Sequence, residues 1–291
     1  MTIQDVATHL NISWDTVKDI QKEYLSKHFG KPNLRDVKQI AVDEITIGKR
    51  HRYLTIVLDL ETGAVIFIGD GRGSDSLKPF WRRLKRAQTK IEAVAMDMSP
   101  AYIHAVRSHL PEAVIVFDHF HIIKLVNDKL SELRRQVYHE TTQYMKYQAL
   151  KGIRWILLKN PENLDEQKNE KQRLEEALTI NKPLATAYYL KEELRQIWNQ
   201  QMKQQAITIL NDWLKRAAAS GLTILKKLAN TIAAHRTGIL AYYDFPISTA
   251  PLEGTNNKIK TMQRAAYGFR DKEFFKLKIF AIHRSRYALL G

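Results

Sequence analysis

Apolar residues between positions 39 and 69 either alternate with polar ones or follow one another directly, and both patterns are typical of β-strands. Three such segments follow one another at 39–47, 51–60 and 64–69. The connections between them, Gly48-Lys49-Arg50 and Glu61-Thr62-Gly63, are short and contain glycine. Short glycine-containing turns favour antiparallel pairing of successive strands. We therefore predict a three-stranded antiparallel meander.

Helices and strands alternate after the meander. Residues 74–87 predict a helix whose apolar positions fall on one face, namely Leu77, Phe80, Trp81 and Leu84. A strand, a helix, a strand and a long helix are then predicted at 91–96, 100–110, 113–117 and about 120–145. The order β-β-β-α-β-α-β-α predicts an α/β core with a mixed five-stranded sheet, in which the first strand is central and lies beside the fourth. This is the ribonuclease H-like plan.

From about residue 147 to 243 the apolar pattern is helical throughout. Apolar residues recur at helical spacing in three segments, 184–203, 206–219 and 222–235. The tryptophans of this stretch are predicted to be core residues rather than nucleic-acid stackers: Trp155, Trp198 and Trp213. One further helix is predicted to begin near Pro251, because proline suits a first helical turn.

The first 28 residues predict two helices joined by a tight turn. The apolar face of the first helix consists of Ile3, Val6, Ala7 and Leu10. Ser13 can cap the second helix, and its predicted inner face consists of Val17, Ile20 and Tyr24. Thr16 and Lys18 are expected to be exposed and to contact DNA, as in a helix-turn-helix. An ordinary helical hairpin is the alternative. A helix-turn-helix normally has another helix before it, so residues 1–30 are expected to be a truncated remnant.

The composition indicates a polyanionic partner. The net charge is +15, from 46 Lys+Arg against 31 Asp+Glu, and such a surplus points most often to nucleic acid. The chain has no cysteine, which excludes disulfides and thiolate zinc sites. It has no run long enough to span a bilayer and no signal peptide. A cytoplasmic protein without a membrane partner is therefore expected.

Three carboxylates are candidates for chemistry. Asp43 and Glu44 lie within a strand that is apolar on both faces, and a buried carboxylate needs a basic side chain or a metal ion beside it. Asp97 ends the fourth strand, which the predicted order brings next to Asp43. Glu253 lies in the first turn of the late helix, where the helix dipole favours an acid. Hard oxygen ligands select Mg²⁺ or Mn²⁺, and three carboxylates can hold two such ions around a phosphodiester.

The end of the chain is strongly basic. Residues 258–286 contain nine Lys+Arg and two acids. Four of these cations are predicted to contact DNA phosphates, namely Lys258, Lys260, Arg264 and Arg270. The alternative is that they form a solvated helix face.

Several motifs in order resemble a known family. The segments Val42-Asp43-Glu44, Met96-Asp97-Met98-Ser99-Pro100 and Phe117-Asp118-His119-Phe120-His121 resemble motifs of the DDE transposases of bacterial insertion sequences. Pro251-Leu252-Glu253-Gly254-Thr255-Asn256-Asn257-Lys258, with Ala266-Tyr267-Gly268-Phe269-Arg270 after it, resembles the third acidic motif. The resemblance covers about residues 2–286 and is closest to the family labelled ISL-three.

The resemblance implies a transposase that cuts and joins DNA at element ends. The implied metal-binding triad is Asp43, Asp97 and Glu253, holding two Mg²⁺ or Mn²⁺ ions, and His121 is the implied contact to the scissile phosphate. The partners are double-stranded DNA of the terminal repeats and the target, with a homo-oligomer assembled on it. Full-length members carry an N-terminal zinc ribbon that this cysteine-free chain lacks. A truncated, catalytically idle remnant that occupies or represses element ends is therefore the alternative function.

The number of residues between the second and third candidate acids also predicts how the chain divides into domains. Asp97 and Glu253 are too far apart for a bare ribonuclease H-like core, so 127–246 is predicted to be an all-helical insertion domain. The core is then divided between 36–126 and 247–291. Two acids remain rivals within the triad: Asp118 could replace Asp97, although it could also cap the helix that follows it, and Glu44 could replace Asp43, although it points to the opposite face.

Overall fold

The computed structural model describes residues 2–48, 52–140 and 149–283. The chain divides into two compact units, which are treated separately below. The first comprises Met1–Asp118 and Phe245–Gly291, and the second comprises His119–Asp244. The second unit begins eight residues before the predicted insertion, 127–246, and ends two residues before its predicted end.

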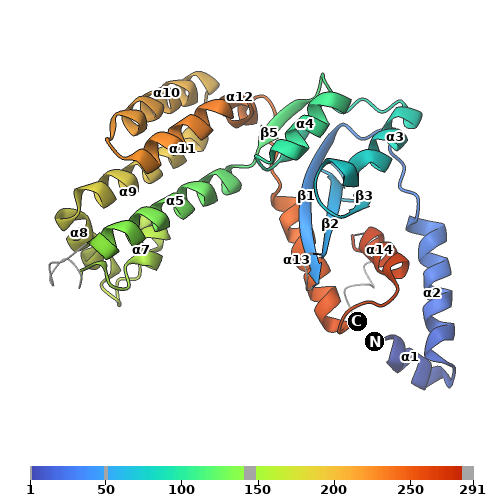
Figure 1. Ribbon diagram of the computed structural model, residues 1–291. Helices are drawn as coiled ribbons and strands as arrows, with labels where there is room; N and C mark the ends of the chain where they lie inside the picture. The colour runs from blue at the N-terminus through green and yellow to red at the C-terminus, as the bar shows by residue number, and fades with distance from the viewer. Residues whose placement is uncertain (1, 49–51, 141–148, 284–291) are drawn as a thin grey trace. The chain divides into compact units, whose positions relative to one another are not determined.

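The first unit is built on one mixed sheet (Figure 1). Its five strands are β1 (Gln39–Gly48), β2 (Arg52–Asp59), β3 (Val65–Asp70), β4 (Ala93–Met96) and β5 (Val114–Phe117). Their order in the sheet is β3-β2-β1-β4-β5. The β1–β2 and β2–β3 pairs are antiparallel, whereas the β1–β4 and β4–β5 pairs are parallel. The predicted mixed five-stranded sheet, with β1 central and beside β4, is confirmed.

Helices pack on the sheet because its strands are apolar on both faces. The predicted helix at 74–87 is a 3₁₀ turn, η1 (Ser74–Leu77), followed by α3 (Lys78–Ala87), and α4 (Pro100–His109) precedes β5. The helices α13 (Ala250–Ala265) and α14 (Lys272–Ala281) complete the unit. Side chains of α13 and α14 share one core with Ala41, Ile45 and Ala95 of the sheet. One face of the sheet is thus covered by the end of the chain.

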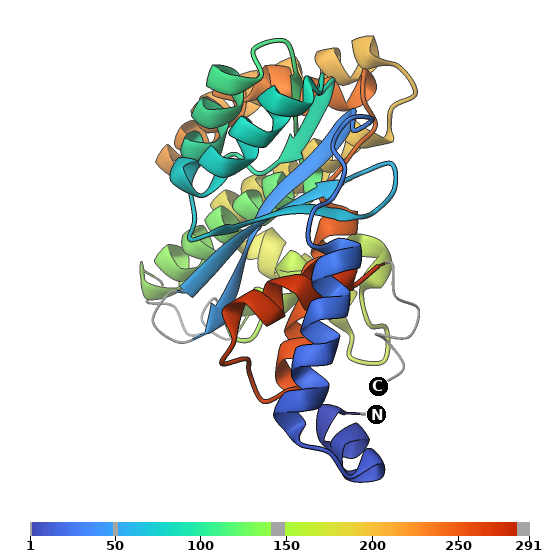
Figure 2. The ribbon, with the colours of Figure 1, turned by 90° about the vertical axis from the view of Figure 1, so that its right-hand side faces the viewer.

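The N-terminal helical pair is α1 (Ile3–Leu10) and α2 (Trp14–Phe29), with Asn11 in the left-handed conformation between them. Its inner face was predicted wrongly, because Ile20 is 62% exposed and Tyr24 is 55% exposed. The buried residue of α2 is Leu25, which clusters with Phe274 and Ala281 of α14. Figure 2 shows α2 and α14 side by side. The partner of α2 is therefore a helix about 250 residues later, which the local pattern does not reveal.

The second unit is helical wherever it is described. Its α-helices are α5 (His119–Glu140), α7 (Arg154–Leu158), α8 (Glu170–Ile180), α9 (Lys182–Arg195), α10 (Lys203–Ala219), α11 (Thr223–Ala234) and α12 (Arg236–Leu240). Among the described residues the unit also contains the 3₁₀ turns η2 (Pro161–Asn163), η3 (Gln196–Asn199) and, after α12, η4 (Ala241–Tyr243). The predicted helix at about 120–145 agrees with α5 as far as Glu140, and residues 141–148 lie outside the described residues. No helix of the described ranges is long and apolar enough to cross a membrane.

The core of the second unit contains two buried polar groups that are satisfied. The Trp213 side chain is fully buried, as predicted, and its Nε1 donates to the Leu190 carbonyl oxygen at 2.7 Å. The Lys191 ammonium is also buried, donates to the carbonyl oxygen of Leu157 at 2.9 Å, and pairs with Glu192. Burial lowers the pKa of Lys191.

The prediction that Trp155 is a core residue was wrong. Its side chain is 65% exposed, because Ile153, Ile156 and Leu157 supply the buried face around α7. Trp198 is half-buried. A tryptophan at helical spacing is therefore a core residue only if its own face meets the rest of the unit.

The two tryptophans provide a matched test of this packing. We expect Trp213→Ala to destabilise the protein by about 3–5 kcal/mol, because it leaves a cavity and removes the hydrogen bond to the Leu190 carbonyl. Trp155→Ala should change stability far less. Urea unfolding followed by circular dichroism measures both, and equal losses would contradict the described packing.

Candidate active site

Asp43 lies in β1, and Asp97 directly follows β4, the parallel neighbour of β1. The β1–β4 register pairs Gln39 with Ala93 and Ala41 with Ala95. The same offset, continued by two residues, brings Asp97, which directly follows β4, beside Asp43. Since alternate residues of a strand share a face, both acids belong to the face of Ala41 and Ala95, which is the face under α13. The predicted convergence of these two acids therefore agrees with the register.

Asn256 of α13 is the side chain that reaches Asp43. Its Nδ2 donates to Asp43 Oδ2 at 2.9 Å, across 213 residues of sequence. Asn256 is only 5% exposed, and its Oδ1 is buried without a hydrogen-bond partner among the described residues. A buried amide oxygen left unsatisfied is costly, so this oxygen is suited to a cation or a donor that enters the site.

Glu253 lies one helical turn before Asn256, in the first turn of α13, and its side chain is exposed. Among the described residues, no three Asp, Glu or His side chains gather closely enough to hold a metal ion. The three predicted carboxylates are thus distributed over β1, the end of β4 and the helix that covers them. The available donors are carboxylate and amide oxygens, and with the unsatisfied Oδ1 of Asn256 they fit a hard divalent cation.

Asp118, the rival to Asp97, fixes the start of α13. Its carboxylate is 3% exposed, and its Oδ2 accepts hydrogen bonds from the backbone N–H of Thr249, at 2.7 Å, and from the Thr249 hydroxyl. Thr249 directly precedes α13, and its carbonyl oxygen accepts from the Glu253 N–H at 2.8 Å. The end of β5 is therefore bonded to the first turn of the helix that carries Glu253.

Glu44, the rival to Asp43, points to the opposite face of the sheet, as the alternation predicts. The Tyr102 hydroxyl from α4 donates to Glu44 Oε2 at 3.3 Å and is bonded to the Thr55 hydroxyl at 3.0 Å. The Gly73 N–H donates to the same phenolic oxygen. Burial raises the pKa of Tyr102.

His121 lies on α5, which belongs to the second unit. Its ring is half-buried and meets Phe120 edge to face, with a centroid distance of 5.8 Å. Its contact with the scissile phosphate stays a prediction.

The predicted DNA contacts on and after α13 are exposed cations. They are Lys258, Lys260, Arg264 and Arg270, and none has an acidic partner in the part of the chain that the structure describes. On α2, Thr16 is exposed and its hydroxyl is bonded to Ser13 at 2.8 Å.

Lys18 differs from its prediction. Its side chain is only 19% exposed and is paired with Asp19 at 3.1 Å and Asp15 at 3.8 Å. It also lies over the Trp14 ring, 5.9 Å from the centroid. The hydrogen bond with Asp19 raises the pKa of Lys18. The expectation of a freely exposed cation overlooked the acids one and three positions away on the same helix.

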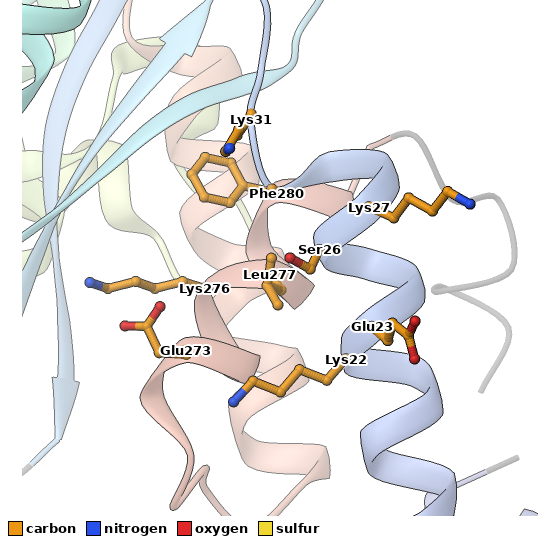
Figure 3. Close-up of a pocket in the computed structure, with 10 residues that line it drawn as sticks. Lys22, Glu23, Ser26, Lys27, Lys31, Glu273, Lys276, Leu277 and Phe280 are labelled. Carbon is orange, nitrogen blue, oxygen red and sulfur yellow. The ribbon is translucent and has the colours of Figure 1, made fainter.

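A groove of about 610 Å³ is lined by residues of α2 and α14, and none of the three candidate carboxylates lines it. Lysines line it from both helices, with Glu23 and Glu273 among them (Figure 3). Two of the lysines are already neutralised, because Lys22 pairs with Asp271 at 2.7 Å and Lys276 pairs with Asp70 at 2.8 Å. The groove is therefore not a strongly cationic site.

Two acids at neighbouring strands of a mixed sheet, with a third acid on a covering helix, are the arrangement expected of a DDE transposase. A family model described as Transposase, that of the ISL3 group of this class, matches residues 40–279, and the chain belongs to this family. The resemblance read from the sequence is thereby confirmed. Divalent metal ions are used generally in this family.

Curated relatives agree with the family. The chain is 36% identical over 282 residues to the transposase of insertion sequence element IS1001 of Bordetella parapertussis, covering 96% of this chain and 69% of that one. It is 26% identical over 288 residues to the transposase of IS1557 of Mycobacterium tuberculosis, covering 91% of this chain and 64% of that one. The chain thus spans about two thirds of the length of these relatives. Its function class is that of insertion-sequence transposases.

A solved structure is also similar, the Drosophila P element transposase strand transfer complex. The match has a TM-score of 0.44 and 12% sequence identity, and it covers 91% of this chain and 81% of that one.

The role of Asp118 can be tested by stability. We expect Asp118→Ala to destabilise the protein by about 1–3 kcal/mol, because two donors of buried Thr249 lose their acceptor. Asp75→Ala is the control, because the Asp75 carboxylate is exposed and forms a surface ion pair with Lys78. Urea unfolding measures both, and equal stability of the two variants would contradict the anchoring role.

Proposed function

We propose that this chain cuts and joins DNA at the ends of an insertion sequence, using divalent metal ions held by Asp43, Asp97 and Glu253. The observation that supports this assignment best is the β1–β4 register, which brings Asp43 and Asp97 to one level of one sheet face. The helix that covers this face supplies Glu253, and family membership supplies the reaction class.

We infer further that the sheet, with α13 and α14, is a ribonuclease H-like core. The helical unit His119–Asp244 would then be its insertion domain, and α1 with α2 would be its helix-turn-helix. Antiparallel pairs on one side of the central β1 and parallel pairs on its other side support this reading. The proposed partners are double-stranded DNA and further copies of the chain.

The proposed cofactor is a pair of Mg²⁺ or Mn²⁺ ions. When bound, such ions make an attacking hydroxyl more nucleophilic and stabilise the leaving oxygen of a phosphodiester. The chain's own residues would hold the ions and orient the carboxylates that bind them. Asp43 and Asp97 offer carboxylate oxygens from adjacent strands, and the Asn256 amide holds Asp43 in place. The Asp118–Thr249 hydrogen bonds fix the turn that presents Glu253.

Asn256 is a positioning residue that the motif reading missed. The sequence contained a usable signal, since Asn256 follows Glu253 by three residues and so lies on nearly the same side of α13. It is a buried polar residue between the core residues Leu252 and Ile259. Lys258 and Lys260, which follow it on the same helix, are placed to neutralise phosphates of the DNA backbone.

Isosteric substitution tests the triad. With Mg²⁺ and DNA carrying the ends of the element that encodes this chain, we expect Asp97→Asn and Glu253→Gln to abolish nicking. Each variant keeps its shape but loses the negative charge that binds a cation. Glu61→Gln, at an exposed turn, should leave nicking unchanged. Full activity of Glu253→Gln would refute the assignment of the third acid.

Adjacent asparagines give a matched pair for the positioning role. We expect Asn256→Ala to weaken Mn²⁺ binding by about 10–100-fold, because partners that orient metal ligands typically contribute that much. Asn257→Ala, whose side chain is exposed, should bind Mn²⁺ as the parent chain does. Electron paramagnetic resonance of Mn²⁺ measures binding without turnover. Similar affinities in the two variants would remove Asn256 from the site.

A further inference from the structure

The second unit carries an exposed tryptophan with a guanidinium over its ring. The Cζ of Arg154 lies 4.6 Å from the ring centroid of Trp155. Both residues belong to α7, and both are exposed. A large aromatic side chain left in solvent beside an arginine is not required by the core, whose contacts in α7 come from Ile156 and Leu157.

Two more arginines, Arg134 and Arg135, lie on the neighbouring helix α5, which contacts α7. Arg134 is half-buried, with its Cζ 5.7 Å from the ring centroid of Tyr138, and Arg135 beside it is exposed. The Nε of Arg134 is buried without a hydrogen-bond partner among the described residues. Burial lowers the pKa of Arg134, and the charges of Arg154 and Arg135 lower it further. The guanidinium groups therefore repel one another across the two helices.

The sequence around these arginines contains almost no acid. Between 133 and 158 there are five Lys+Arg and one acid, Glu140. Glu132, which precedes this stretch, lies close enough to Arg135 to feel its charge but pairs with Lys129 at 2.9 Å. Within the described ranges, Arg134 and Arg154 form no ion pair.

Two other arginines of the same unit are paired with acids. Arg195 pairs with Glu162 and Glu192, and Arg216 pairs with Glu193 and Asp212. The unit thus neutralises those arginines with two acids each. The cluster on α5 and α7 has no such acids among the described residues, and gathering like charges without counter-ions costs free energy unless an anion binds there.

We propose that Arg134, Arg135 and Arg154, with Trp155 beside them, form a surface that binds the phosphate backbone of double-stranded DNA. Guanidinium groups present forked donors that match phosphate oxygens, and a row of phosphates supplies the negative charge that the cluster lacks. The aromatic ring adds contact area against the sugar-phosphate surface. The proposal adds a second DNA surface to the proposed function, in a unit that holds none of the three carboxylates.

Salt dependence of binding is the decisive measurement. The full chain is titrated with a short DNA duplex of arbitrary sequence, in EDTA, and fluorescence anisotropy is followed over a range of KCl concentrations. Each phosphate contact contributes about 0.9 to the slope of log K against log salt. We expect the double variant Arg134→Gln/Arg154→Gln to lose about two units of slope and to bind more weakly.

The control removes the same charge from the same unit. Lys168→Gln/Arg216→Gln changes two exposed or partly exposed cations that acids already neutralise. It should keep the parent slope, and Arg134→Lys/Arg154→Lys should restore most of it. Equal slopes in the cluster and control variants would overturn the proposal.

Crosslinking tests the surface without removing an arginine. A benzophenone amino acid in place of Trp155 should crosslink to the duplex, whereas the same group at the exposed Tyr189 should not. A crosslink only at 189, or none at 155, would overturn the proposal. Because EDTA prevents turnover, Asp97→Asn should show the parent slope. Loss of nicking and loss of slope therefore report separately on the proposed function and on this surface.

Discussion

The bond between Asp118 and Thr249 is the constraint on which the first unit depends. Asp118, which follows β5, and Thr249, which precedes α13, are 131 residues apart in sequence. A buried carboxylate with two donors from one residue joins them, and charged hydrogen bonds in a buried setting are among the stronger polar interactions. This bond brings α13 back to the sheet, so that its apolar stripe covers β1 and β2 and its polar residues meet Asp43. The candidate site is therefore a consequence of how the interrupted core is closed.

The features that could be predicted from the sequence are those decided by local periodicity and strand order. Period-two alternation placed Asp43 and Glu44 on opposite faces, and the order of elements placed β4 beside β1. The inner face of α2 could not be predicted, because α14 decides it and lies at the far end of the chain. The Asn256–Asp43 hydrogen bond was missed for a related reason. A motif identifies acids by their chemistry, whereas the amide becomes significant only when the helix is docked on the sheet.

Charge in this protein is arranged in two ways. In the helical unit, Arg195 and Arg216 are tied to acids on the same or adjacent helices, and Lys191 is satisfied by carbonyl oxygens at the end of α7. Arg134 and Arg135 of α5, Arg154 of α7 and the cations of α13 have no such partners among the described residues. The net charge of +15 is thus expressed on particular faces rather than spread evenly. Exposure of Trp155, which the helical pattern alone placed in the core, identifies one of those faces.

The packing of α14 has a mechanical consequence. Phe275 and Ile279 of this helix enter the core of the sheet, while Phe274 and Ala281 contact α2, so α14 is held between the two. The ion pair between Lys22 and Asp271 adds a polar link at the same contact. The N-terminal helical pair is consequently packed against the rest of the first unit, and its distance from the sheet is not set by the length of a flexible linker. The N-terminal helical pair is therefore joined to the sheet through the packing of α14, so a shift of α2 would strain the contacts that α14 makes with the sheet.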